Sequence, residues 1–265
     1  MRTRNLLIAG SFVAIAVLEE MRPLRKRVES KGRHVIRDLA IAALSGLATA
    51  AMHARLVEPV ARRVESRQQG LLRRLLLPRP LRIAAGVLLL DYTLWIWHWL
   101  NHRTSTLWRL HRAHHVDLDL DSWTALRFHF GEMTLAGAVR MMQIRLIGPD
   151  PMAVTIWQSL LLPSIFFHHS KIELPWALER ALSRVIVTPR MHAIHHSTVR
   201  EETDSNWSSL LSVWDFLHGS FRLDRREVTI GVPAYQRPED VTIGKVLVMP
   251  LKPADGDWVE LKIED

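Results

Sequence analysis

Short clusters of histidines constrain this chain more than any other feature of its sequence. Five of the 14 histidines fall between positions 98 and 115, in the patterns His-x3-His and His-x2-His-His, and the second pattern recurs at 192–196. Residues three and four positions apart share one face of a helix, so each cluster would direct its imidazoles to a common point. Such density and spacing are typical of a metal site. The clusters consist of His98 and His102; His111, His114 and His115; and His192, His195 and His196.

The amino-acid composition limits which residue types could bind a metal and which partners the chain could have. The chain has no cysteine, which excludes disulfides, iron–sulfur clusters and thiolate ligands and leaves histidine as the main source of soft-to-borderline ligands. Its net charge of +8 would suit a nucleic-acid binder, but the arginines flank apolar runs and no base-stacking motif accompanies them. We therefore expect anionic lipid headgroups as the counter-charge, and no nucleic-acid partner.

Apolar runs predict a chain that crosses a membrane several times. The first, at 6–18, is short for a full span of about 20 residues, but it lacks a cleavage site and is interpreted as a retained membrane helix. A second run at 39–52 is rich in small residues, which favour close helix packing in membranes. A third, at 81–97, ends in aromatic residues typical of the membrane interface. The first histidine cluster would therefore emerge at the membrane surface.

Two further apolar runs, at 134–146 and 152–167, predict a helical hairpin, because the turn sequence Gly-Pro-Asp-Pro joins them. Arg140 and Arg145 in the first arm are costly in hydrocarbon. The hairpin would thus either penetrate partway or turn these arginines to a cavity or the interface. A hairpin returns the chain to the side it left, which would place His129, His169 and the last cluster on one face with the others. The basic loop at 22–37 favours the cytoplasm for that face.

The chain divides into three expected parts. Residues 1–80 would hold the N-terminal membrane helices and a basic amphipathic segment at 54–80, residues 81–221 the histidine-bearing domain with its hairpin, and residues 222–265 a tail. In the tail, 228–230 and 245–248 look β-like, while 241–248 could be a strand or disordered. The expected fold is all-α: a multi-pass membrane helical bundle with a cytoplasmic, histidine-rich helical cap and a small irregular C-terminal tail.

Three further histidines stand alone, and haem and zinc are the alternatives to a two-metal site. His34 and His53 are interpreted as ordinary surface or core residues, and His218 remains open. A haem site needs one histidine on each side of the ring, so triplets oversupply it. A mononuclear catalytic zinc site uses three protein ligands, whereas up to ten histidines are available here, enough for two metals. A membrane haem- or zinc-binding protein without oxygenase activity stays open as the alternative.

The order of these motifs resembles the fatty acid hydroxylase / sterol desaturase superfamily of integral-membrane dinuclear-metal oxygenases. The resemblance runs from about Asp91 to Phe221. It includes the short sequences that lead into the three histidine clusters, at 91–92, 107–111 and 188–192. It also includes an isolated Arg-Phe-His, a His-Ser after an apolar helix, Asn206, and the segments 212–215 and 219–221. Several spaced motifs in the right order are more specific than one cluster.

The resemblance implies an O2-dependent lipid hydroxylase or desaturase with two iron ions, although zinc would also occupy such sites in recombinant material. It further implies a separate electron donor, either a reductase or a small redox carrier. Asp91, Asp215 and Asn206 are candidates for holding the ligands in place from behind. The implied metal ligands are His98, His102, His111, His114, His115, His129, His169, His192, His195 and His196.

Overall fold

The structure, a computed structural model, describes residues 2–258, with the side chains of residues 2–4 excepted. It is all-helical, as expected, and within the described residues it has isolated β-bridges but no strand. The last residues of the expected tail, 259–265, lie outside the described part. The α-helices are α1 (Arg2–Met21), α2 (Lys31–Met52), α3 (Glu58–Ser66), α4 (Leu71–Arg74), α5 (Arg79–Arg103), α6 (Ser105–His115), α7 (Phe130–Ile147), α8 (Pro151–His169), α9 (Trp176–Leu182), α10 (Pro189–His195), α11 (Arg200–Thr203), α12 (Val213–Leu217) and α13 (Ile243–Val248). Short π and 3-10 turns complete the set: His53–Val57, Thr124–Leu126, Pro233–Tyr235, Pro238–Val241 and Met249–Leu251.

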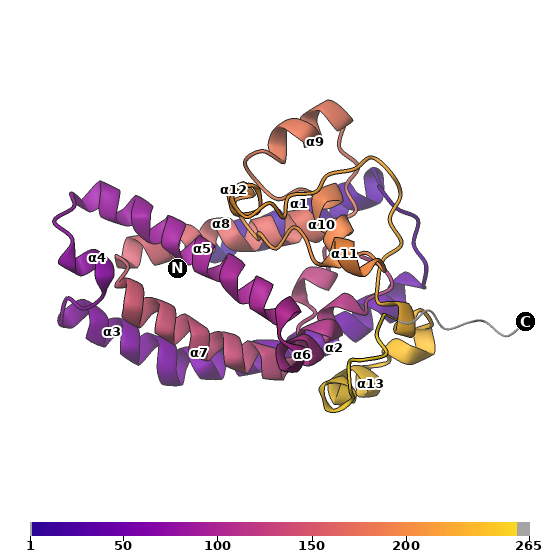
Figure 1. Ribbon diagram of the computed structural model, residues 1–265, viewed down its shortest axis with the longest axis horizontal. Coiled ribbons are helices and arrows are strands. Elements are labelled where there is room, and N and C mark those ends of the chain that lie inside the picture. Colours follow the sequence, from indigo (N-terminus) through magenta and orange to yellow (C-terminus); the bar gives the residue numbers. More distant parts are fainter. Residues whose placement is uncertain (1, 259–265) are drawn as a thin grey trace, which may run out of the picture.

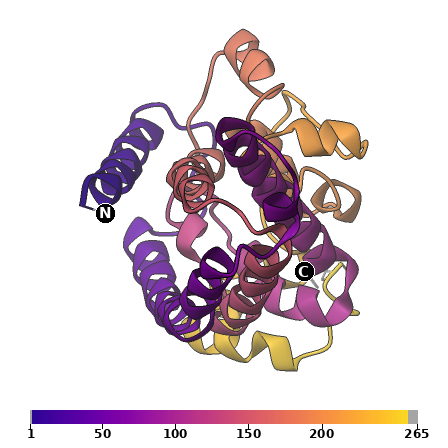
Figure 2. The ribbon, with the colours of Figure 1, turned by 90° about the vertical axis from the view of Figure 1, so that its left-hand side faces the viewer.

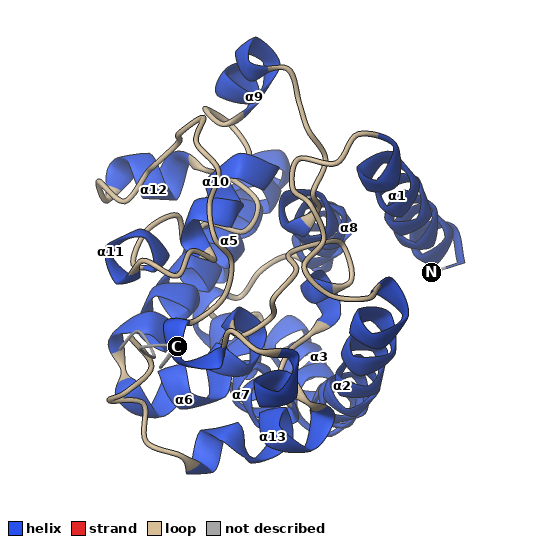
Figure 3. Cartoon of the chain, turned by 90° about the vertical axis from the view of Figure 1, so that its right-hand side faces the viewer, coloured by secondary structure: helices blue, strands red, loops and turns tan. Residues whose placement is uncertain are grey.

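Long helices form the body of the molecule, and short helices close one end of it. Helices α1, α2, α5, α7 and α8 run roughly lengthwise, while α6, α10, α11 and α13 gather toward the right-hand end in Figure 1. The view onto that end shows short helices and loops lying across the ends of the long ones (Figure 3). From the opposite end, α1 stands beside the other long helices (Figure 2). This arrangement gives the bundle a distinct cap.

The predicted turn joins α7 and α8 and is fixed by local chemistry, although α7 packs mainly on α2 and α8 mainly on α5 and α1. Gly148 ends α7 with a positive φ of 64°, and a Cβ there would approach the Gln69 carbonyl oxygen to 2.2 Å. Asp150 then caps α8 by accepting a hydrogen bond from the Met152 amide at 2.9 Å. Gly70, at φ 101°, packs directly on Gly148. The hairpin turn and the segment before α4 therefore meet at the end of the bundle opposite the cap.

Within the described part of the chain, two stretches are long and apolar enough to cross a membrane, by length and composition. They are 31–74, which begins with α2, and helix α5. They contain the apolar runs expected at 39–52 and 81–97. The other three expected runs form α1, α7 and α8, which are helical but are not among these two candidates.

The long helices expose large apolar side chains to their surroundings. Leu7 on α1, Leu47 on α2 and Leu146 on α7 are 68%, 70% and 68% exposed. Extensive apolar surface of this kind is typical of a surface that meets lipid or another apolar partner. The faces of the bundle are thus compatible with contact to lipid chains.

The basic segment at 54–80 is mostly helical and lies against the hairpin. Its π turn and α3 present Val57 and Val64, which pack with Ile144 of α7 in one buried cluster. Its arginines 62, 63 and 67 point outward. The segment therefore has an apolar side and a basic side, as an amphipathic element requires.

A buried ion-pair network ties α2 to the loop after α6. Arg37 donates a hydrogen bond to Asp117 at 2.6 Å, and Arg127 donates one to Asp38 at 3.0 Å. The fully buried His34 lies 3.0 Å from Asp121 through its Nε2. His34 therefore belongs to the core of the protein, as expected, and the arginines offset the acidic charges around it.

The tail differs from the expected β-like runs. Residues 245–248 lie in α13, and of 228–230 only Ile230 takes part in a bridge, with Ser197. Val241, Val246 and Met249 are all buried, and their separations of five and three residues would put Val246 on the opposite face of an extended strand from the other two. These side chains share a core cluster with residues of α6, so the tail packs against the element that carries the second histidine cluster.

Arg112 holds the tail onto α6. It is fully buried and donates hydrogen bonds to the Met249 and Lys252 carbonyls and, at 2.7 Å, to the Asp257 carboxylate. A buried guanidinium with this many partners is expensive to replace, because each partner would be left desolvated and unpaired.

We expect Arg112→Met to lower the free energy of unfolding by about 3–5 kcal/mol, the range for breaking a buried ion pair. Thermal unfolding in detergent and limited proteolysis between residues 249 and 258 measure the effect. Arg62→Met removes an exposed arginine paired with Glu58 and should change both readouts little. Equal behaviour of the two variants would contradict the role assigned to Arg112.

Candidate metal centre

The structure brings nine of the ten expected ligands together at the capped end of the bundle. Helices α5, α6, α8 and α10 each contribute at least one of them. They form two groups, and within each group one ligand nitrogen per residue lies within 4.8 Å of the others. The group of five contains His98, His102, His111, His115 and His195; the group of four contains His114, His169, His192 and His196.

Outer contacts set the orientation of the rings in the group of five. The Nδ1 atoms of His98 and His195 each lie 2.7 Å from a carbonyl oxygen, that of Trp207 and that of Ser205 respectively. His111 Nδ1 lies 2.8 Å from the Glu132 carboxylate. An Nδ1 that donates to such an oxygen leaves Nε2 unprotonated in a neutral ring. These rings therefore direct Nε2 lone pairs toward one another.

In the group of four, the inward nitrogens lie especially close to one another. His114 and His169 use Nδ1 to contact the Arg127 and Ile165 carbonyls at 3.0 and 2.8 Å. Their Nε2 atoms lie 3.0 Å apart, and His192 Nε2 lies 3.0 Å from the same His169 nitrogen. When both Nδ1 atoms donate, two lone pairs face each other across the first contact, which repel unless a cation lies between them. The donor set thus fits a metal ion.

Burial favours the neutral form of several of these imidazoles. Burial lowers the pKa of His114, His115, His192 and His196 well below the ordinary range, and neighbouring imidazoles lower it further. Burial likewise lowers the pKa of His195 to about 3, and its Nε2 is buried without a hydrogen-bond partner. Neutral rings with unpaired inward nitrogens are the form in which histidine binds a metal.

The three residues expected to hold the ligands from behind all make hydrogen bonds to, from or within the segment at 204–220. Asp215 is fully buried and accepts hydrogen bonds at 3.0 Å from the backbone amides of Trp207 and Ser208. Trp207 in turn supplies the carbonyl that contacts His98. None of the three forms a hydrogen bond with a grouped histidine. Each instead helps to fix the loop that lies behind those histidines.

Asp91 and Asn206 anchor the same loop at other points. Asp91 of α5 accepts hydrogen bonds from the Trp214 indole at 2.7 Å and the Leu211 amide at 3.2 Å. Asn206, with a positive φ of 53°, donates from its side-chain amide to the Met191 carbonyl at 2.8 Å. The loop is therefore tied to α5 on one side and α10 on the other.

The structure does not bring His129 into either group. Its Nδ1 accepts a hydrogen bond from the Gly131 amide at 3.1 Å and caps α7, while its Nε2 lies 3.1 Å from the Leu247 carbonyl. His218 also stays outside, stacked on Trp95 with ring centroids 4.1 Å apart. Both histidines have structural partners of their own.

Two residues at the site were not among the expected ones. His168 is buried, with its ring centroid 4.2 Å from that of His192 and its Nδ1 unpaired. The double histidine at the end of an apolar helix was the available signal. Glu132, the partner of His111, is also buried, and its signal was a lone carboxylate at the start of the hairpin's first arm.

Comparison with known proteins gives relatives that act on lipids, according to their names. Ornithine lipid hydroxylase OlsE of Rhizobium tropici is 29% identical over 145 residues, which cover 54% of this chain and 43% of that protein. Human alkylglycerol monooxygenase is 28% identical over 142 residues, covering 54% of this chain and 31% of its own length. Human cholesterol 25-hydroxylase is 26% identical over 155 residues, covering 56% and 52%. The match thus spans about half or less of these relatives.

No solved structure matches the chain significantly. The family described as fatty acid hydroxylase, however, matches residues 83–220, more than half of the chain. That stretch holds all nine histidines of the two groups, as well as Glu132 and the loop behind them. The chain belongs to the fatty acid hydroxylase family.

Proposed function

We propose that this chain is a membrane-bound, O2-dependent lipid hydroxylase or desaturase whose nine grouped histidines hold two iron ions. The observation that carries the proposal is the division of these histidines into groups of five and four, with unprotonated nitrogens directed inward. Each group offers at least as many ligands as one four-coordinate metal site uses. The names of the relatives, hydroxylases and monooxygenases, support the reaction class.

Iron is the metal that suits both the ligands and the reaction. Imidazole binds iron, zinc, copper and nickel, so the ligands alone do not select among them. Bound iron would supply the redox chemistry needed to break an unactivated C–H bond, which acid–base side chains cannot do. The chain's own residues orient the imidazoles through Glu132 and backbone carbonyls and bury the site from bulk water.

A haem site fits this geometry less well. In each group, four or five imidazole nitrogens lie within 4.8 Å of one another. A porphyrin occupies the four equatorial positions of its iron and leaves only two axial positions for protein ligands. The crowding of imidazoles around each point therefore favours ions bound by histidine alone.

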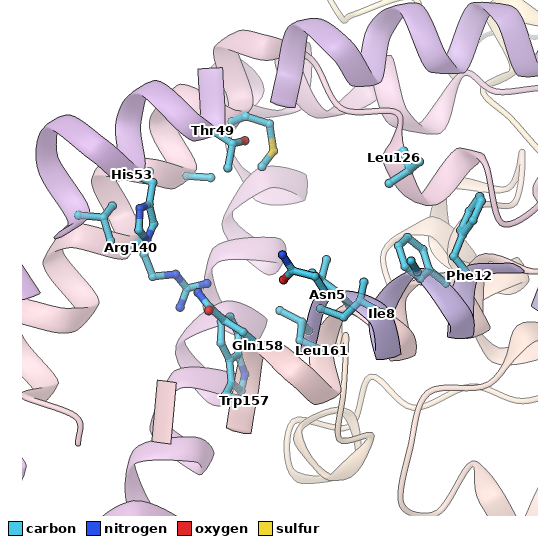
Figure 4. A pocket seen from close by; sticks show the side chains of 17 residues that line it. Asn5, Ile8, Phe12, Thr49, His53, Leu126, Arg140, Trp157, Gln158 and Leu161 are labelled. Atoms are coloured by element: carbon cyan, nitrogen blue, oxygen red, sulfur yellow. The ribbon is translucent and has the colours of Figure 1, made fainter. Parts of the chain in front are cut away.

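A cavity whose lining comes within one helical turn of His169 offers a place for a lipid. It has a volume of about 690 Å³ and lies among α1, α2, α7 and α8 (Figure 4). Its lining includes Phe166, one helical turn before His169, and Leu126, which precedes the Arg127 carbonyl that contacts His114. Phe128 stacks on the His114 ring with centroids 4.3 Å apart. We infer that a lipid in this cavity reaches toward the group of four.

The remaining parts of the chain take supporting roles in this proposal. Residues 1–80 supply membrane helices and walls of the cavity, and residues 81–221 form the catalytic domain. The described part of the tail, up to residue 258, packs against α6. The bundle crosses the membrane several times with the histidine cap on the cytoplasmic side, where the basic loop at 22–37 also lies. Hydroxylation consumes one O2, two electrons and two protons, and places one oxygen in the lipid and the other in water. A separate reductase or redox carrier supplies the electrons.

The direct test is expression in a host given iron and a compatible electron donor, followed by mass analysis of its lipids. We expect a lipid heavier by one oxygen, or lighter by two hydrogens, that is absent in the His114→Ala/His196→Ala double variant. A Soret band of haem with unchanged lipids would overturn the proposal in favour of a haem-binding protein without oxygenase activity.

Glu132 should tune iron binding without being a ligand. Glu132→Gln keeps the shape of the side chain but removes the charge that fixes His111 in its tautomer. We expect iron affinity, measured by competition with a chelator, to fall about 10–100-fold, as for other residues that position metal ligands.

The matched control is Glu58→Gln, which makes the same chemical change on exposed α3 and should leave iron affinity unchanged. Wild-type affinity in Glu132→Gln would show that the His111–Glu132 contact does not support the site.

A further inference from the structure

Arg140 places a guanidinium inside the cavity described above. It projects from the middle of α7, and its Cζ lies 4.1 Å from the centre of the Trp157 ring. Figure 4 shows the guanidinium directed toward Gln158, with His53 on the same side and Phe12 toward the opposite end of the cavity. The cavity therefore has a polar, cationic end and an aromatic, apolar end.

No carboxylate of the described residues offsets this charge. The cavity lining contains no acidic residue, and Arg140 Nη1 is buried without a hydrogen-bond partner. By contrast, the fully buried Arg127 and Arg112 have carboxylate partners: Arg127 bonds Asp38 at 3.0 Å, and Arg112 bonds Asp257 at 2.7 Å. A desolvated guanidinium without an anion is costly, so a ligand that brings an anion into the cavity gains a strong contact.

We propose that Arg140, with Gln158 and His53 beside it, binds the oxyanion of a single-chain amphiphile whose hydrocarbon chain runs along the cavity toward the histidines. The oxyanion is a carboxylate or a phosphate monoester, either of which a guanidinium binds with charge-assisted hydrogen bonds. The cavity volume of about 690 Å³ is in the usual range for one small ligand and suits a single chain. This inference rests on the proposed oxygenase function and specifies its substrate class.

The positions of these residues also predict where the chain is oxidised. Trp157 and Phe166 both line the cavity from α8 and are separated by about 14 Å along the helix, at about 1.5 Å per residue. His169 follows Phe166 by one turn. An acid group at Arg140 therefore places the reacting carbon well along the hydrocarbon chain, away from the acid.

The test compares ligands that differ only at the head. Binding of palmitate, hexadecyl phosphate and hexadecanol is measured on the iron-loaded, full-length protein in nanodiscs. We expect one or both anions to bind at least about tenfold more tightly than the alcohol, the scale of a charge-assisted hydrogen bond. Palmitate binding alone would assign a carboxylate, and hexadecyl phosphate binding alone a phosphate. Equal binding of all three would overturn the proposal.

Variants then assign the effect to one residue. Arg140→Gln should remove the preference for anions, whereas Arg140→Lys, which keeps the charge, should retain most of it. Arg145→Gln is the matched control, because Arg145 lies on the same helix but bonds Gln69 at 2.8 Å outside the cavity. Iron content, which should be unchanged in all three, confirms that the variants fold. An anion preference that persists in Arg140→Gln would contradict the assignment.

The outcome separates this inference from the proposed function. Anion binding that depends on Arg140, without any oxygenated product, would refute the oxygenase and leave the binding site in place. Oxygenated lipid produced equally by wild type and Arg140→Gln would refute the binding site and leave the oxygenase in place.

Discussion

Unprotonated imidazole nitrogens that face one another are the constraint on which this structure depends. His114 and His169 direct their Nε2 atoms at each other from 3.0 Å, and both use Nδ1 toward a carbonyl oxygen. In a buried site such an arrangement is unfavourable without a cation, because neither nitrogen has a proton to share. A metal ion bound between them, as proposed, would turn this repulsion into coordination. Part of the folding free energy is therefore expected to come from the metal.

Much of the remaining architecture serves to hold those nitrogens in place. Helices α5, α6, α8 and α10 deliver the rings, and loops supply the carbonyls that fix their tautomers. Asp215 shapes the loop behind His98, while the ion pairs of Arg127 fix the backbone whose carbonyl contacts His114. The tail, anchored by Arg112, packs on the far side of α6. Carboxylates thereby offset the buried guanidinium charges of Arg112 and Arg127 beside the site.

Sequence spacing predicted which histidines converge because helical periodicity carries three-dimensional information: nine of the ten expected ligands come together, and their binding of metal stays a prediction. His129 was also expected as a ligand, but a histidine just before a helix can instead accept a hydrogen bond from the first turn of that helix, and only the geometry separates the two roles. Glu132 was not foreseen, since its contact with His111 joins separate helices. The sequence already indicated that Arg140 would be costly in hydrocarbon, and in the structure its side chain lines a cavity. The α13 helix was missed because a short apolar run has no clear period.

The most direct test of the central claim is the number of iron ions bound per chain, measured by elemental analysis of protein reconstituted with iron. Two groups of histidines predict about two ions in the wild type. They also predict about one in His195→Ala, which disrupts the group of five, and about one in His192→Ala, which disrupts the group of four. A wild-type content of one ion or none, or unchanged iron in both variants, would contradict the two-metal account.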